Sequence, residues 1–216
     1  MRRTSRVAVV LALSAFGSMA CKDKSAQPAP TVGQAPTLPA VAAPPAPAVP
    51  DPCATTKLVA AGETFEGITL HCYGSRTYQT WLMAFNKHTS MLRAGEKLSV
   101  PPFEELLAAR VPAEWRADVA PVAVAYREFH SVEATVNAGF ASHSKPNANT
   151  QQHLRNAITQ LGAAIVTIKA RGARVNQFET AVAQLRDIAE GGGGSPDYAT
   201  EEVHQRIALG VDALPR

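Results

Sequence analysis

The order of short apolar and turn segments in residues 57–101 constrains the fold more than any other feature of the chain. Residues 57–59 and 97–100 alternate as short strands do. Residues 62–64 predict a turn into a helix, with Thr64 as its N-cap. Two helical runs lie between the strands, with apolar residues three and four positions apart. Their apolar residues are Phe65, Ile68, Cys72, Tyr78, Trp81, Leu82 and Phe85.

This segment resembles the LysM family of glycan-binding modules. The family pattern is a strand followed by Gly-Asp-Thr-Leu, an Ile, Tyr-Gly, an Asn and Leu-x-x-Gly-x-x-Leu-x-Ile-Pro. The matching positions here are Gly62, Glu63, Thr64, Phe65, Ile68, Tyr73, Gly74, Asn86, Leu92, Gly95, Leu98, Val100 and Pro101. The departures are Glu63 for Asp, Phe65 for Leu and Thr69 for Ala.

The resemblance implies recognition of N-acetylglucosamine-containing glycans, in peptidoglycan or chitin, by a shallow groove between two loops. Apolar surface suits sugar rings and N-acetyl methyl groups, while exposed backbone groups of turns suit hydroxyls and amides. The alternative roles are core packing for Phe65 and helix capping alone for Thr64. Carried over by position, the glycan-binding residues are Gly62, Glu63, Thr64 and Phe65 from the first loop and Thr89, Ser90, Met91 and Leu92 from the second.

The first 21 residues have the layout of a secretory signal. Three arginines among the first six residues precede an apolar run at 7–16 and small residues at 17–20. The run is too short to span a bilayer core of about 30 Å. Residues 18–21 resemble the lipobox of bacterial lipoproteins, which implies a lipid anchor on Cys21. The alternative is ordinary signal cleavage, which leaves Cys21 as a free thiol.

Residues 21–52 are rich in Pro and Ala and predict an extended linker. About thirty residues at ~3.1 Å each reach on the order of 90 Å when fully extended, enough to lift a module from a membrane toward a cell wall. Lys22 occupies the position at which an Asp signals retention in the inner membrane in some bacteria. The absence of that Asp favours an anchor in the outer membrane, with the protein on the periplasmic side.

The net charge argues against a nucleic-acid partner. The formal charge of +3 includes the three arginines of the signal, and their removal leaves 18 basic and 18 acidic residues. Basic residues do not cluster with aromatic ones, as they do on nucleic-acid-binding surfaces.

Three cysteines in an exported chain leave one odd thiol, which lipidation of Cys21 removes from the count. Cys53 and Cys72 bracket the first strand and helix, and an oxidising compartment permits a disulfide between them. The sequence has no CxxC pair and no paired-His spacing, so neither a metal site nor a cofactor is predicted.

Residues 103–216 predict a helical bundle, because apolar residues recur at three- and four-residue spacing over several long runs. Gly172 either bends one long helix or separates two, and residues 191–194 form a break. The predicted fold is therefore α+β, with a small βααβ LysM-like module followed by an all-α bundle. The predicted domains are a signal peptide at 1–20, a lipidated Cys and linker at 21–52, the module at 53–102 and the helical domain at 103–216.

The helical half carries no recognisable catalytic motif. It contains no Cys, and its two small clusters of charged side chains are typical of solvated helix faces. We therefore expect a noncatalytic lipoprotein that binds peptidoglycan and presents its helical domain to a protein partner. The alternative is a peptidoglycan hydrolase, or a regulator of one, with its activity in the helical domain. The two clusters are Glu128, His130 and Glu133 on one helix and Glu201, Glu202 and His204 on the last.

Overall fold

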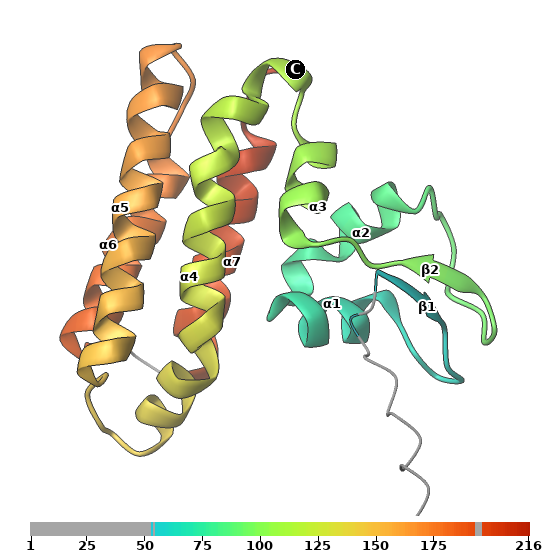
Figure 1. Cartoon of the computed structure of the whole chain (residues 1–216), viewed down its shortest axis with the longest axis horizontal. Coiled ribbons are helices and arrows are strands. Elements are labelled where there is room, and N and C mark those ends of the chain that lie inside the picture. The colour runs from blue at the N-terminus through green and yellow to red at the C-terminus, as the bar shows by residue number, and fades with distance from the viewer. Residues whose placement is uncertain (1–52, 54, 193–195) are drawn as a thin grey trace, which may run out of the picture. The chain divides into compact units, whose positions relative to one another are not determined.

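The computed structural model describes residues 53, 55–192 and 196–216 (Figure 1). The expected signal segment at 1–20, the lipidated Cys21 and the linker at 21–52 lie outside the described residues. The described part of the chain is mostly helical, with seven α-helices and one two-stranded sheet. None of its helices is both long enough and apolar enough to cross a membrane.

Residues 55–102, called here the two-strand segment, contain a small antiparallel sheet with helices between its strands. Lys57 on one strand lies opposite Leu98 on the other. The elements follow one another as β1 (Thr56–Leu58), α1 (Phe65–Tyr73), the 3-10 turn η1 (Arg76–Tyr78), α2 (Gln79–Phe85) and β2 (Lys97–Ser99).

Side-chain hydrogen bonds set where these helices begin and end. Thr64 Oγ1 accepts a hydrogen bond from Gly67 N at 3.0 Å, which confirms the predicted N-cap of α1. Gly74 ends α1 in the left-handed conformation, with φ of 71°. Asn86, at the end of α2, accepts from Ser99 N at 2.8 Å and donates to Ser99 O at 2.9 Å. One amide therefore joins the end of α2 to β2.

The predicted disulfide between Cys53 and Cys72 is confirmed. It joins Cys53, which precedes β1 in the chain, to the last turn of α1, with the two Cα atoms 5.4 Å apart. A crosslink across a sequence separation of 19 residues stabilises a fold by roughly 3 kcal/mol in the chain-entropy account.

The rest of the chain is helical, and its four longest helices lie side by side (Figure 1). Their apolar faces meet in a continuous core. Gly172, with φ of 81°, separates two helices, because α5 ends at Ala170 and α6 starts at Asn176. The elements are α3 (Phe103–Arg110), the 3-10 turn η2 (Ala113–Trp115), α4 (Arg116–Ala141), α5 (Ala148–Ala170), α6 (Asn176–Glu190) and α7 (Pro196–Asp212).

Aromatic rings join the two-strand segment to the helices. The rings of Phe103 and Tyr126 stack with centroids 3.6 Å apart. Tyr78, from η1, packs edge-on against Phe103 at 5.0 Å and against Tyr126 at 6.1 Å. All three side chains are at most 4% exposed. The two parts of the described chain therefore share one core.

The prediction that both charged clusters are solvated is wrong for Glu133 and His204. Glu133 is 7% exposed and His204 is fully buried. The cause is tertiary packing, because α4 lies against α7 and η1 covers the same place. Glu201, also predicted to be solvated, accepts hydrogen bonds from Ser75 Oγ at 2.8 Å and Thr77 Oγ1 at 3.0 Å.

Candidate functional site

Seven of the eight residues expected to bind glycan line one pocket of about 450 Å³. One wall comes from the turn before α1 and the opposite wall from the loop between α2 and β2. Gly62, the eighth residue, lies in an adjoining hollow of about 470 Å³ that shares Glu63 and Thr64 with the pocket. The lining residues are Glu63, Thr64, Phe65, Glu66, Gln79, Met83, Thr89, Ser90, Met91 and Leu92.

The first wall is held by its own polar side chains. The Glu63 carboxylate accepts a hydrogen bond from Lys57 Nζ at 2.5 Å and one from Ala60 N at 2.7 Å. The bond from Lys57, followed by that from Ala60, lowers the pKa of Glu63. Phe65 is only 4% exposed and belongs mainly to the core. Hydrogen bonds within the turn therefore fix the shape of this wall before a ligand binds.

The second wall combines apolar and hydroxyl groups. The side chain of Met91 is 84% exposed, the highest value among the large apolar residues that stand out from the described surface. Leu92 is partly buried and packs against the core, while Thr89 and Ser90 are exposed. A small apolar surface beside two hydroxyl groups suits a polar ring with an apolar face.

His88 connects the second wall to the rest of the site, and the sequence did not suggest it. Its Nδ1 lies 3.2 Å from Ser90 O, and its Nε2 contacts the carboxylate of Glu96. The His88 ring also packs edge-on against Phe65, with centroids 5.3 Å apart. The contact with Glu96 is the main cause of a raised pKa of His88. Partners that meet only by closure of a loop leave no local pattern in the sequence.

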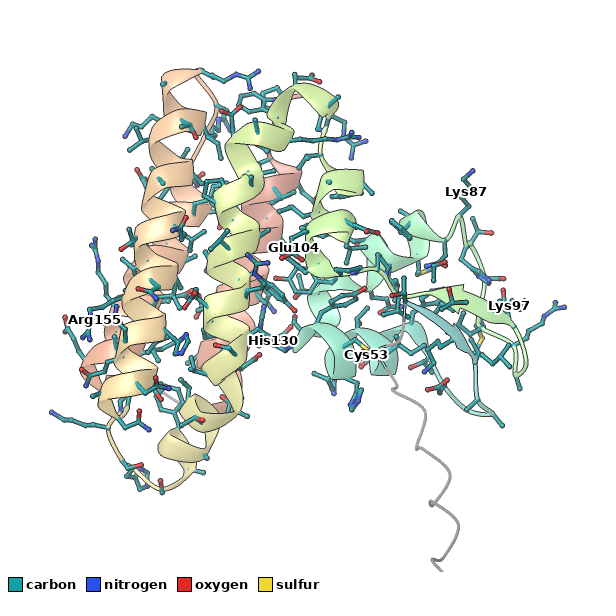
Figure 2. The ribbon with its side chains drawn as sticks, in the orientation of Figure 1. Cys53, Lys87, Lys97, Glu104, His130 and Arg155 are labelled. Atoms are coloured by element: carbon teal, nitrogen blue, oxygen red, sulfur yellow. A yellow bond between two sulfur atoms is a disulfide. The ribbon has the colours of Figure 1, made fainter. Side chains whose placement is uncertain are left out.

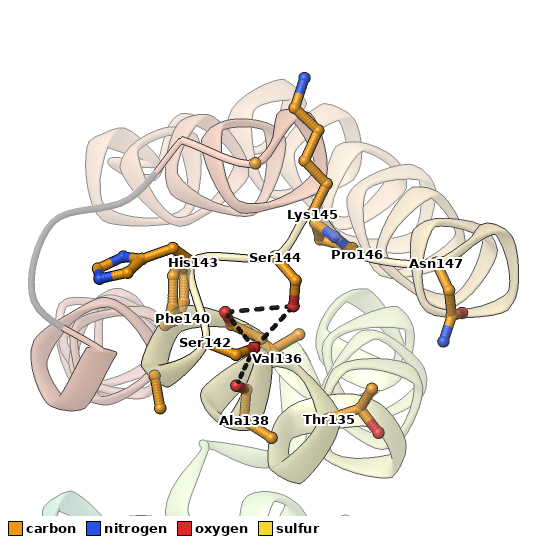
Figure 3. A pocket seen from close by; sticks show the side chains of 13 residues that line it. Thr135, Val136, Ala138, Phe140, Ser142, His143, Ser144, Lys145, Pro146 and Asn147 are labelled. Atoms are coloured by element: carbon orange, nitrogen blue, oxygen red, sulfur yellow. Dashed lines mark hydrogen bonds between the residues drawn. The ribbon is translucent and has the colours of Figure 1, made fainter. Parts of the chain in front are cut away.

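A separate pocket of about 880 Å³ lies at the end of the bundle (Figure 3). It is lined by the last turns of α4, the following loop to Asn147 and Gly191. The hydroxyls of Ser142 and Ser144 lie 2.8 Å apart, and Ser142 Oγ donates to Ala138 O at 2.9 Å. The described lining residues include no Asp or Glu.

A chain of polar side chains crosses the junction between the two-strand segment and the bundle. His204 Nδ1 lies 3.1 Å from the Tyr78 hydroxyl, and its Nε2 lies 3.2 Å from Glu133 Oε1. The other Glu133 oxygen lies 3.0 Å from His130 Nδ1. His130 and Cys53, both labelled in Figure 2, are among the residues that line a hollow.

The charge of Glu133 depends on this arrangement. Burial by itself raises the pKa of Glu133, but hydrogen bonds from His130 and His204, together with their positive charges, lower it to about 2. A buried carboxylate that accepts from two imidazoles is well satisfied. The described residues contain no group of three or more His, Cys, Asp or Glu placed to hold a metal ion.

Comparisons of the chain with protein-family models, curated proteins and solved structures found no match. Function is therefore inferred from the residues of the pocket itself.

Proposed function

We propose that the chain is a noncatalytic lipoprotein of the bacterial envelope that binds peptidoglycan glycan through a LysM-like module at residues 53–102. The observation that carries this proposal is the pocket between residues 63–65 and residues 89–92. A lipid on Cys21 and the linker at 21–52 tether the module to the outer membrane. The helical domain at 103–216 then presents its surface to a protein partner.

The pocket has the size and chemistry for a sugar residue of an N-acetylated glycan. Its volume of about 450 Å³ falls among ordinary ligand sites, which span roughly 300–1,000 Å³. Met83, Met91 and Leu92 supply apolar surface for an acetyl methyl group or a ring face. Gln79 and Ser90 supply groups that can pair with hydroxyls and amides.

The fixed geometry of the first wall favours binding. Glu63 and Thr64 are already held by hydrogen bonds within the turn. A ligand therefore does not have to order that wall, and little free energy is lost on association.

Sedimentation with insoluble peptidoglycan tests the proposal, using the purified chain of residues 22–216. Met91→Glu places a charge on the exposed rim of the pocket without disturbing the core. Val166→Glu makes the same change at a residue of α5 that is 68% exposed. Both variants have the same net charge, so nonspecific attraction to the wall is matched.

The proposal expects the wild type and Val166→Glu to pellet and Met91→Glu to stay largely in solution. If all three remain soluble, or all three pellet equally, the pocket is not the binding site. Release of soluble glycan fragments from the pellet favours the hydrolase alternative.

A further inference from the structure

His88 lies between two hydrogen-bond acceptors. Its Nδ1 faces the carbonyl oxygen of Ser90 at 3.2 Å, and its Nε2 faces the Glu96 carboxylate. Its side chain is 17% exposed; the contact with Glu96 is partly buried, and the contact with Ser90 is exposed. Neither acceptor carries a hydrogen, so both contacts need an N–H from the histidine ring.

Only the charged form of the ring meets that requirement. A neutral imidazole has one N–H and one lone pair, whereas an imidazolium ion has two N–H donors. When His88 loses its proton, one ring nitrogen presents a lone pair to an oxygen, and that contact becomes repulsive. Either the link to Ser90 or the link to Glu96 must then open.

Both links hold the second wall of the pocket. Ser90 belongs to the loop that supplies Thr89, Met91 and Leu92, and Glu96 closes the same loop by accepting from Arg93 N at 3.1 Å. From the other wall, Phe65 packs against the His88 ring. His88 thus touches both walls while its two nitrogens hold one of them.

We propose that His88 is a protonation-controlled positioning residue, which holds the loop at residues 89–92 in place when charged and releases it when neutral. The consequence for glycan rests on the proposed function, namely that binding is strongest in mildly acidic solution and weakens as pH rises.

The surrounding charges set the direction of the effect. Glu96 is the carboxylate that faces His88, and Arg93 acts on Glu96 in turn. The hydrogen bond to Glu96 raises the pKa of His88, and the hydrogen bond from His88 lowers the pKa of Glu96. The link is complete below the ordinary histidine pKa and is lost as pH rises through the raised value. On the acid side it is lost as pH falls through the lowered pKa of Glu96.

Two readouts on the chain of residues 22–216 test this inference. The first is the affinity for a soluble N-acetylglucosamine oligomer between about pH 6 and about pH 9, where a histidine with a raised pKa titrates. The second is the hydrogen-exchange protection of the Arg93 and Glu96 amides over the same range, corrected for intrinsic exchange, because these amides donate to Glu96 Oε2 and Arg93 O within the same loop. His88→Gln removes the titration, and His153→Gln is the matched control, because His153 is a partly exposed histidine paired with Glu128.

The wild type and His153→Gln should lose affinity by about fivefold as pH rises, the effect of one hydrogen bond, and loop protection should fall with it. His88→Gln should be weak and flat in both readouts. Equal pH profiles for the wild type and His88→Gln overturn the inference. If no oligomer binds at any pH, the proposed function fails, and loop protection alone decides whether His88 holds the loop.

Discussion

His204 on α7 and Glu133 on α4 are separated by 71 residues in sequence, yet His204 Nε2 lies 3.2 Å from Glu133 Oε1 within the core. The pair continues to Tyr78 of η1 on one side and to His130 on the other. This chain of polar groups joins the two-strand segment to the helical bundle. Its members should therefore contribute to the stability of both.

Glu133→Gln should lower the free energy of unfolding by about 2–4 kcal/mol, because it removes the charge that two buried or half-buried histidines share. Glu128→Gln is the matched control on the same helix, since Glu128 also accepts from a histidine but its side chain is 28% exposed. Its expected cost is below about 1 kcal/mol. Urea unfolding of both variants measures the two changes in the free energy of unfolding. Equal changes contradict the structural role of Glu133.

The lowered pKa of Glu133 predicts a loss of stability in acid. A carboxyl group whose pKa falls on folding stabilises the protein above its unfolded pKa, and that stability disappears as pH falls toward the folded value. For Glu133 the window runs from the ordinary value of 4.5 down to about 2. Unfolding measured across this window should show the wild type losing about 2–3 kcal/mol more than Glu133→Gln. Parallel curves show that Glu133 does not carry this pH dependence.

Gly74→Ala should destabilise the fold more than Gly172→Ala does. Both glycines have positive φ, so an alanine is strained at either place, by about 1–2 kcal/mol. A Cβ at Gly74 also lies 2.4 Å from Glu133 Oε2 and 2.9 Å from His130 Nδ1, whereas one at Gly172 meets nothing within 4 Å. Thermal unfolding should show the lower melting temperature for Gly74→Ala. Equal losses of stability would contradict the idea that the close approach of Gly74 to Glu133 excludes a side chain there.

Cys72→Ser should reduce stability by roughly 3 kcal/mol by removing the crosslink to Cys53. The wild type treated with a reductant is the control, because it removes the same bond without changing a side chain. The two samples should unfold at similar urea concentrations, both below the oxidised protein. A reduced protein as stable as the oxidised one rules out a structural role for the disulfide.

Local patterns in the sequence were sufficient to predict most of the helices and strands. Thr64 was predicted as the N-cap of α1, and the apolar spacing of residues 103–216 predicted the helices that follow. These signals are local because capping and periodicity depend on neighbouring residues. The role of Gly172 was left open, since either outcome is compatible with the apolar spacing on both sides.

The polar contacts could not be predicted in the same way. Glu133 and His204 each sit on an amphipathic helix with a charged neighbour, which is the usual pattern of a solvated face. Their burial depends on which helices meet, and helix periodicity does not specify that. His88 was missed for the same reason, because its link to Glu96 exists only after the loop between α2 and β2 closes.

Glycan binding in this pocket is tested by mapping a soluble N-acetylglucosamine oligomer on the amide NMR spectrum of residues 22–216. The largest shift changes should fall on Thr64, Thr89, Ser90 and Met91, on both walls of the pocket. Little change is expected at residues 135–147, at the pocket at the end of the bundle (Figure 3). Changes confined to the bundle pocket, or no change at saturating oligomer, contradict glycan binding between the two walls.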